Sequence, residues 1–224
     1  MGRSHWQGKL SEELDFWYRY HTNGHIRRAD QYNNRLDPDE PLQERIAQLL
    51  PEHDEVDILD VGAGPLTCVG KYLEGVKVNI TATDPLADDY DILLVSRGIT
   101  PLVHTQKCDG ERLTELFPPD SFDVVYARNS LDHSYNPVEA IAQMYTVTRP
   151  GGYVVLEHWL NEGRKNGYSG LHQWDFCVQD NDFHINSRSG KTNMGKLYPG
   201  VLTWELVNEG YGDWIVVTIL KISL

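Results

Sequence analysis

The sequence predicts an α/β fold, namely a doubly wound, mostly parallel seven-stranded sheet whose last strand is antiparallel, with an N-terminal helical cap. From Val56 onward, short apolar runs rich in β-branched residues alternate with helical segments, which is the pattern of βαβ units. The runs are almost continuously apolar, as expected for strands that are buried on both faces. The chain ends in two strand-like runs around a glycine-rich turn, which predicts a hairpin that closes the sheet.

Five strands are expected before that hairpin: VDILDV (56–61), VKVNITAT (76–83), PLVHTQKC (101–108), FDVVYA (122–127) and YVVLEH (153–158). Two helices between them have recognisable ends. PLTCVGKYLEG (65–75) has apolar residues on one face and stops at Gly75. NPVEAIAQMYTV (136–147) opens with Asn136 as N-cap, and Glu139 is placed to close a capping box.

Two regions fall outside this alternation. Residues 1–50 are helical in pattern and rich in aromatic residues, so we expect an N-terminal cap on a core formed by residues 51–224. Residues 160–200, approximately, are polar, rich in Gly and Asn, and without periodicity. Long loops of this kind in compact domains are often lids or binding loops, so this insertion is predicted to be a substrate loop.

The composition and net charge limit the classes of partner that the protein is expected to bind. The formal net charge is −13, from 20 Lys and Arg against 33 Asp and Glu. A nucleic acid or an anionic membrane would be repelled by this balance, so we expect neither as a partner, while a small site on a tRNA or rRNA stays open. The N-terminus lacks the apolar core of a signal peptide, and no apolar run approaches the ~20 residues that cross a bilayer. These observations predict a cytoplasmic protein; the oligomeric state stays open.

The turn after the first strand is the first candidate site. In open α/β sheets, ligands bind beyond the carboxyl ends of the strands, and Gly62 and Gly64 would let backbone N–H groups approach a ligand there. A dinucleotide fingerprint needs a third glycine where Thr67 stands. The Asp60 carboxylate would repel a pyrophosphate but accept a hydrogen bond from an ammonium group. The turn therefore favours a zwitterionic cofactor without phosphate.

Two more acidic residues follow successive strands. Asp84, at the end of the second strand, is placed to accept both hydroxyls of a ribose. Asp109, in CDGERL, is placed to accept from an adenine amino group. A single Asp at a strand end is usually a cap or a turn residue. Three of them at successive carboxyl ends, with Asp60 as the first, indicate a nucleoside site.

The motifs ILDVGAGP, ITATDPL, CDGERL, FDVVYARNSLDHS and VTRPGGYVVLEH together resemble class I S-adenosylmethionine-dependent methyltransferases, in order and spacing. The resemblance covers residues 56–158 and the final hairpin, and it departs from the longer family pattern at Leu66, where a glycine is usual. It implies S-adenosyl-L-methionine as cofactor. It also implies a set of cofactor-binding residues, from the methionine end to the ribose, the adenine and the reactive end: Asp60, Gly62, Ala63 and Gly64, then Asp84 and Pro85, then Asp109 and Gly110, then Asn129.

Methyl transfer requires an aligned acceptor and often a base, and histidine suits that role because its unperturbed pKa is ~6.5. Among the histidines beyond the strand ends and in the insertion, we rank His158 and His172 first as catalytic residues and His133 next. Each has the alternative role of a hydrogen-bonded structural histidine, and His133 has the further alternative of lining the cofactor pocket. His184 ranks lower.

A metal is not predicted. Asp132, Glu157 and Glu162 are the possible ligands of a divalent ion, but histidine-rich surroundings do not favour magnesium. The stretch GYSGLHQWDF (167–176) mixes aromatic and polar side chains, which suits a sugar-like ring; a lid whose aromatics pack on the core is the alternative.

The sequence thus predicts a methyltransferase of the EC 2.1.1 type that acts on a small polar acceptor, by O-methylation of a sugar or a related hydroxyl metabolite. Two alternatives stay open. One is a non-catalytic S-adenosylmethionine-binding subunit of a complex. The other is a nicotinamide-dependent reductase, against which Asp60 and Thr67 both argue.

Overall fold

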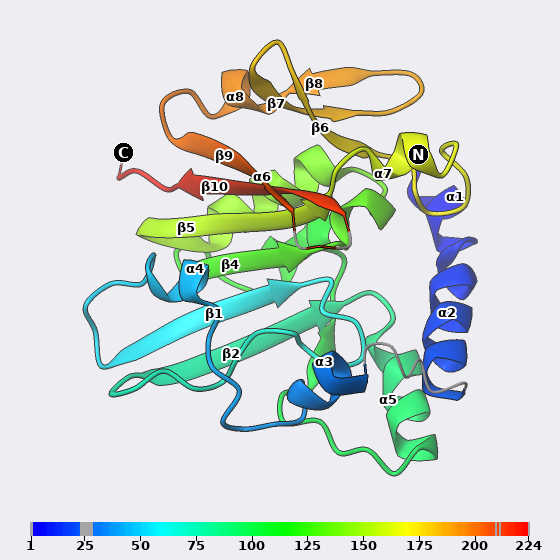
Figure 1. Cartoon of the computed structure of the whole chain (residues 1–224), viewed down its shortest axis with the longest axis vertical. Helices are drawn as coiled ribbons and strands as arrows, with labels where there is room; N and C mark the ends of the chain where they lie inside the picture. Colours follow the sequence, from blue (N-terminus) through cyan, green and yellow to red (C-terminus); the bar gives the residue numbers. More distant parts are fainter. Residues whose placement is uncertain (1, 23–28, 209, 211, 224) are drawn as a thin grey trace.

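A computed structural model of the chain describes residues 2–22, 29–208, 210 and 212–223. Its main feature is a seven-stranded sheet with the order β3-β2-β1-β4-β5-β10-β9 (Figure 1). The strands are β1 Glu55–Val61, β2 Lys77–Asp84, β3 Thr105–Lys107, β4 Phe122–Arg128, β5 Thr148–Trp159, β9 Leu202–Asn208 and β10 Asp213–Leu220. The first five are parallel, and β10 pairs antiparallel with both β5 and β9. The predicted fold class is confirmed, although the third strand is shorter than its apolar run.

The central strands are buried on both faces, as their apolar runs predict. On one face Leu59 and Val125 join the main core cluster, which the helix α6 (Pro137–Val147) covers. On the other face Ile58 and Val124 pack against the short helix α4 (Glu44–Ala47). The change of face from one residue to the next follows from the two-residue period of a strand.

Helix α6 begins where the sequence predicts. Asn136 caps it, since its side chain accepts a hydrogen bond from the backbone N–H of Glu139 (3.3 Å). The capping box is only half formed, because the N–H of Asn136 donates to Glu111 (2.8 Å) instead of to Glu139. This bond ties the start of α6 to the 3-10 helix η2 (Gly110–Glu115) that follows β3.

The helix predicted over residues 65–75 is wrong: the structure describes this whole segment, and it is irregular. Its backbone is engaged by a part of the chain about thirty residues earlier. Lys71 and Tyr72 both donate their N–H groups to the carbonyl of Glu40 (2.8 and 3.0 Å), and the side chain of Gln43 bonds to two more backbone groups of the segment. These contacts replace the hydrogen bonds that a helix would make within itself.

The N-terminal region contains four helices in the part that the structure describes, with irregular chain at residues 35–43, and residues 23–28 lie outside that part. It contains α1 (Arg3–Gln7), α2 (Leu10–Thr22), α3 (Ala29–Asn34) and α4. Helix α2 packs on α5 (Ala87–Ser96), and both stand beyond the edge of the sheet to which the parallel strands point (Figure 1). Helix α2 therefore covers the end of the sheet where ligands bind in open α/β folds.

The insertion is not the structureless loop that its composition indicates. It forms a second, three-stranded antiparallel sheet, with two short helices beside it: α7 Glu162–Lys165, β6 Asp175–Gln179, β7 Asp182–Asn186, β8 Lys191–Asn193 and α8 Met194–Leu197. Asp180 and Asn181, both with positive φ, make the two-residue turn between β6 and β7. Such turns favour Asn and Asp, so QDND was the available signal for this hairpin. Within the described part of the chain, none of the helices is long and apolar enough to cross a membrane.

Candidate active site

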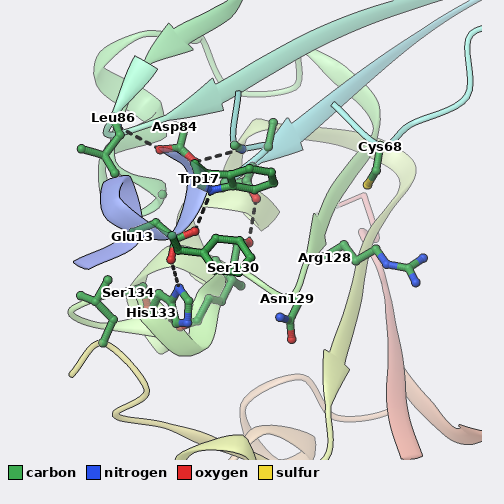
Figure 2. A pocket seen from close by; sticks show the side chains of 18 of the residues that line it. Glu13, Trp17, Cys68, Asp84, Leu86, Arg128, Asn129, Ser130, His133 and Ser134 are labelled. Carbon is green, nitrogen blue, oxygen red and sulfur yellow. Dashed lines mark hydrogen bonds and ion pairs between the residues drawn. The ribbon is translucent and has the colours of Figure 1, made fainter. Parts of the chain in front are cut away.

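A cavity of about 820 Å³ opens beyond the carboxyl ends of β1, β2 and β4 (Figure 2). Its volume lies within the range of ~300–1,000 Å³ that is typical of small-molecule sites. The lining includes most of the residues that the sequence analysis singled out: Asp60, Gly62, Ala63, Gly64, Asp84, Pro85, Gly110, Asn129, His133 and His172. It does not include Asp109 or His158.

The turn after β1 needs its glycines. Gly62 and Gly64 have φ of +71° and +67°, a region that side-chain-bearing residues rarely adopt. A Cβ on Gly62 would lie 2.4 Å from the Cβ of Ser130, and one on Gly64 would lie 2.9 Å from the ring of Trp17. The N–H groups of this turn are already engaged, because those of Gly62 and Ala63 donate to a β2 carbonyl (2.8 and 3.0 Å).

Asp60 sits at the base of the turn and is 1% exposed. Its Oδ2 accepts a hydrogen bond from the Thr67 hydroxyl (2.6 Å), whereas its Oδ1 has no hydrogen-bond partner among the described residues. Burial raises the pKa of Asp60 to about 6, although the bond from Thr67 opposes this rise. A buried, unsatisfied carboxylate oxygen that lines a cavity suits a cationic donor such as an ammonium group.

Asp84 ends β2 and is held by two backbone N–H groups. Leu86 donates to Oδ1 (2.9 Å) and Gly64 donates to Oδ2 (3.1 Å), which leaves each oxygen able to accept a further bond. Burial raises the pKa of Asp84 to about 7, and the nearby acids Glu13 and Asp60 add to the rise. Figure 2 shows Glu13 of α2 close to Asp84, on the same side of the cavity.

Asp109 is placed differently from the expectation. Its carboxylate pairs with Arg3 of α1 through Nε (2.9 Å) and Nη2 (2.8 Å), and it lies outside the cavity lining. The adjacent Gly110 and Glu111 line the cavity instead. Glu111 was not singled out from the sequence; burial raises its pKa to about 7, while the bond from the Asn136 N–H opposes this.

Two histidines and one aspartate meet at the short 3-10 helix η3 (Leu131–His133), just after β4. His172 of the insertion places its Nδ1 2.8 Å from Oδ2 of Asp132 and 3.0 Å from Nε2 of His133. The third contact, between Nε2 of His133 and Oδ2 of Asp132, is 3.3 Å. The fold thus brings together two predicted catalytic histidines that are 39 residues apart. We call Asp132, His133 and His172 the histidine–aspartate cluster.

The electrostatics of this cluster favour positive charge. Burial disfavours the charged form of His133, but Asp132 and Glu13 outweigh burial and raise its pKa to about 10. Burial alone would raise the pKa of Asp132, yet the surrounding histidines lower it to about 2. Glu162, nearby on α7, has its pKa raised by burial and by the charge of Asp132.

His158 lies behind the cluster and not on the cavity. It is 1% exposed, stacks on Phe176 with the ring centroids 4.0 Å apart, and keeps its Nδ1 4.0 Å from Oδ1 of Asp132. Neither ring nitrogen has a hydrogen-bond partner within the described part of the chain, and burial lowers its pKa to about 4. His184, in β7, is also buried and also lies outside the lining.

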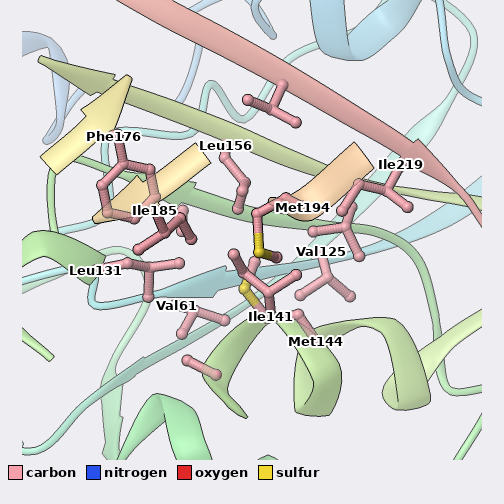
Figure 3. Packing of buried hydrophobic residues seen from close by; sticks show 14 of the residues in the cluster. Val61, Val125, Leu131, Ile141, Met144, Leu156, Phe176, Ile185, Met194 and Ile219 are labelled. Carbon is pink, nitrogen blue, oxygen red and sulfur yellow. The ribbon is translucent and has the colours of Figure 1, made fainter. Parts of the chain in front are cut away.

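The stretch 167–176 holds itself together and does not present its aromatics to the cavity. Tyr168 donates its hydroxyl to Asp175 (2.6 Å), and the Trp174 indole N–H donates to the carbonyl of Ser134 (2.9 Å). Phe176 is part of the main core, together with Ile185 and Met194 of the insertion (Figure 3). From this stretch the cavity receives Ser169, Gly170, Leu171 and His172.

Aromatic faces reach the cavity from other elements. Trp159 and Trp214 lie side by side at the ends of β5 and β10, with ring centroids 4.7 Å apart. Arg128 lies over the ring of Trp214 at 4.8 Å and pairs with Glu157 (3.0 Å). Glu157 is thus paired with an arginine. Of the other two carboxylates considered as metal ligands, Asp132 belongs to the cluster and Glu162 lies near it.

Comparison with known proteins agrees with this geometry. A model of the methyltransferase domain family matches residues 30–192, which is more than half of the chain. The chain belongs to this methyltransferase family. It is a class I methyltransferase that depends on S-adenosylmethionine, as the sequence predicts. The alternative of a nicotinamide-dependent reductase has no support.

Individual relatives match part of the chain. An uncharacterized methyltransferase of Schizosaccharomyces pombe is 35% identical over 104 residues, which cover 43% of this chain and 37% of that protein. The tRNA U34 carboxymethyltransferase of Idiomarina loihiensis is 30% identical over 128 residues, which cover 54% of this chain and 38% of that protein. The methyltransferase thus spans less than two fifths of the length of these curated relatives.

Solved structures share the fold. A Thermotoga maritima S-adenosylmethionine-dependent methyltransferase has a TM-score of 0.52 at 18% identity, and the match covers 97% of this chain and 98% of that chain. The CMeT domain of citrinin polyketide synthase has a TM-score of 0.55 at 16% identity, over 80% of this chain and 50% of that chain. At these identities the likeness concerns the fold alone.

Proposed function

We propose that this methyltransferase transfers a methyl group from S-adenosylmethionine to a hydroxyl of a small polar acceptor, such as a sugar or a related metabolite. The observation that carries the proposal is the position of the histidine–aspartate cluster. His133 and His172 line the same cavity as Asp60 and Asp84. A hydroxyl acceptor is the class that most needs such a group, because its proton must leave during transfer.

The cofactor fits the residues present. Asp60 offers its unsatisfied oxygen to the ammonium group, and Asp84 offers one acceptor position on each oxygen to the ribose hydroxyls. Gly110 and Glu111 replace Asp109 as the groups that would lie near the adenine. Asn129, at the end of β4, would lie near the reactive end.

The cofactor supplies an electrophilic methyl group on a positively charged sulfur, which keeps the bonding electron pair and becomes a neutral thioether when the acceptor oxygen takes the methyl. The chain must align the acceptor, exclude water and take up the acceptor's proton. In the cluster, Asp132 and Glu13 stabilise positive charge on His133. His172, the most exposed of the three with 31% of its side chain accessible, is the member that a substrate would meet first.

A small acceptor is supported by the lining and by the charge. Trp159 and Trp214 provide flat apolar faces, and the neighbouring Arg128 and Asn129 provide polar groups. A mixture of apolar faces and polar groups suits a hydroxyl-rich ring. The sequence predicts such a mixture in residues 167–176 instead. The net charge of −13 argues against a polyanionic acceptor.

The test is a screen of sugars and other hydroxylated metabolites with S-adenosylmethionine, followed by mass spectrometry for the gain of one CH2. His172→Ala is expected to lower kcat on a positive acceptor while S-adenosylhomocysteine still binds with the wild-type Kd. His104→Ala, in an exposed histidine–aspartate pair outside the cavity lining, is the matched control. Methylation confined to nitrogen or carbon atoms, or a His172→Ala variant as fast as the wild type, would refute the proposal.

A further inference from the structure

We propose that the histidine–aspartate cluster is a binding site for one divalent transition-metal cation, held by Oδ2 of Asp132, Nε2 of His133 and Nδ1 of His172. The inference rests on the proposed function for its role, but the site itself can be measured without any methyl transfer. It differs from the carboxylate-rich magnesium site that the sequence analysis weighed.

The first argument is the shape of the cluster. Its three ligand atoms form a triangle with sides of 2.8, 3.0 and 3.3 Å. Ligand atoms about 2.1 Å from one cation, and at about right angles to one another, are about 3.0 Å apart. The triangle is therefore one face of an ordinary coordination shell, formed by two imidazoles and one carboxylate.

The second argument is that hydrogen bonds cannot form along all three sides of this triangle. Each ring nitrogen carries at most one proton and an ionised carboxylate carries none, so at most two of the three contacts become hydrogen bonds. The remaining contact then brings together either two N–H groups or two lone pairs, and it is repulsive. A cation at the centre makes all three contacts favourable.

The third argument is the hydrogen bonding around the cluster. Nδ1 of His133 faces Oε2 of Glu13 at 3.3 Å, while Oε1 of Glu13 accepts the indole N–H of Trp17 at 2.8 Å (Figure 2). A proton on Nδ1 of His133 leaves the lone pair of Nε2 for a metal. Carboxylate–histidine–metal chains of this kind orient the ligand and increase its basicity.

The fourth argument is a pair of unsatisfied oxygens beside the triangle. Oδ1 of Asp132 and Oε2 of Glu162 are both buried and have no hydrogen-bond partner in the part of the chain that the structure describes. Asp132 is 1% exposed, and the other oxygen of Glu162 lies 3.9 Å from Nδ1 of His172. A bidentate Asp132 or a rotated Glu162 would therefore supply a further ligand atom.

The ligand set selects the class of cation. Imidazole nitrogens with a carboxylate suit Mn²⁺, Fe²⁺, Co²⁺ or Zn²⁺, whereas Mg²⁺ and Ca²⁺ prefer oxygen ligands throughout. Because His133 and His172 line the cavity, positions on the open side of the cation would be left for an acceptor hydroxyl. Lewis-acid polarisation there would lower the pKa of the hydroxyl. In the metal-bound form the proton would then leave to solvent before the oxygen takes the methyl, which would replace the proton uptake by the histidines proposed for the metal-free protein.

The test uses the full chain, dialysed against a chelator and titrated with Co²⁺ while its visible absorption is recorded. We expect one Co²⁺ per chain with an absorption band of a mixed nitrogen and oxygen shell, and no such band for His172→Ala. Glu13→Gln is expected to weaken Co²⁺ binding ~10–100-fold, the usual effect of removing an orienting carboxylate. Asp15→Asn, an exposed carboxylate on the same helix, and His104→Ala are expected to bind as the wild type does.

S-adenosylhomocysteine binding and the unfolding midpoint of each variant show whether it is folded. Absence of the Co²⁺ band in the folded wild type, or an unchanged band in folded His172→Ala, overturns the metal site. The proposed function would survive that result if the metal-free protein methylates a hydroxyl. Conversely, stoichiometric Co²⁺ binding by a protein that methylates no hydroxyl would support the site and overturn the proposed function.

Discussion

Glu13 and His133 join the N-terminal helix α2 to the end of β4. Oε2 of Glu13 lies 3.3 Å from Nδ1 of His133, and the same carboxylate accepts the indole N–H of Trp17, whose ring lies against Gly64. One side chain thus connects helix α2 with the histidine–aspartate cluster and, through Trp17, with the glycine turn.

Removal of this carboxylate is expected to loosen α2. Glu13→Ala loses one hydrogen bond to an indole and one charge-assisted contact to an imidazole, so we expect a loss of ~1–3 kcal/mol of unfolding free energy. Urea denaturation of the two proteins measures it. Asp15→Ala on the same helix faces solvent, so its midpoint should stay near that of the wild type. Equal losses in the two variants would mean that the removal of an acidic side chain from the N-terminal half of α2, and not the loss of the bridge, is responsible.

Asp84 is expected to control cofactor affinity. Hydrogen bonds from two ribose hydroxyls to one carboxylate are worth ~1.5–3 kcal/mol each, so Asp84→Ala should weaken S-adenosylhomocysteine at least ~10-fold. Titration calorimetry gives the two Kd values. The control is Asp88→Ala, four residues after Asp84, where the carboxylate forms a solvent-exposed pair with Lys107, and its Kd should not change. An unaltered Kd for Asp84→Ala would place the ribose elsewhere.

The same residue gives a pH dependence of stability. The pKa of Asp84 is 3.8 in its unperturbed state and about 7 in the folded protein, where burial, Glu13 and Asp60 all raise it. The folded state therefore binds the proton of the Asp84 carboxyl more tightly than the unfolded state does. The stability that results is complete below pH ~4 and is lost as the pH rises towards 7.

Asp84→Asn has no such proton to lose. We expect the stability difference between Asp84→Asn and the cofactor-free wild type to shift in favour of the variant as the pH rises from 4 to 7. Denaturant midpoints at intervals of pH measure this shift, and the comparison cancels the titration of other groups. A constant difference across this range would contradict the raised pKa of Asp84.

The glycine turn allows the energetic cost of a steric clash to be separated from the cost of backbone strain. Gly62 and Gly75 have almost the same φ, +71° and +72°, but an added Cβ would meet Ser130 at 2.4 Å in the first case and nothing within 4 Å in the second. Gly75→Ala should cost only the ~1–2 kcal/mol of a left-handed alanine. Gly62→Ala should cost ~1–3 kcal/mol more, because the core must move.

A double variant separates the two costs. Ser130→Gly removes the side-chain atoms that the new methyl meets, so Gly62→Ala combined with Ser130→Gly should recover most of the excess. Thermal unfolding of the four proteins completes the cycle. If the double variant is no more stable than Gly62→Ala, the clash with Ser130 is not the cause of the loss.

Much of the fold could be predicted because it depends on local pattern. The β-branched apolar runs placed β1, β2, β4 and β5, and Asn136 marked the start of α6. The helix predicted over 65–75 failed because Glu40 and Gln43, distant in sequence, take its backbone hydrogen bonds. Tertiary contacts of that kind leave no trace in the apolar periodicity of the segment itself.

Most of the residues that line the candidate site could be picked out from the sequence, but their arrangement could not. Asp60 and Asp84 stand at strand ends, where the fold class directs ligands. His133 and His172 were both ranked as candidates, yet only the folded chain brings them to 3.0 Å from each other. The pairing of Asp109 with Arg3 depends on the position of α1 relative to the sheet, which cannot be predicted from the sequence of α1.

The irregular segment after β1 also bears on competition with other molecules that carry adenosine. With no helix behind it, the glycine turn presents no positive dipole, and the N–H groups of Gly62, Ala63 and Gly64 are all bonded within the protein. Asp60 adds a negative charge at its base. Adenine nucleotides, whose phosphates need those donors and that dipole, would thus be discriminated against at a turn that still accepts an ammonium group, even where they far outnumber S-adenosylmethionine.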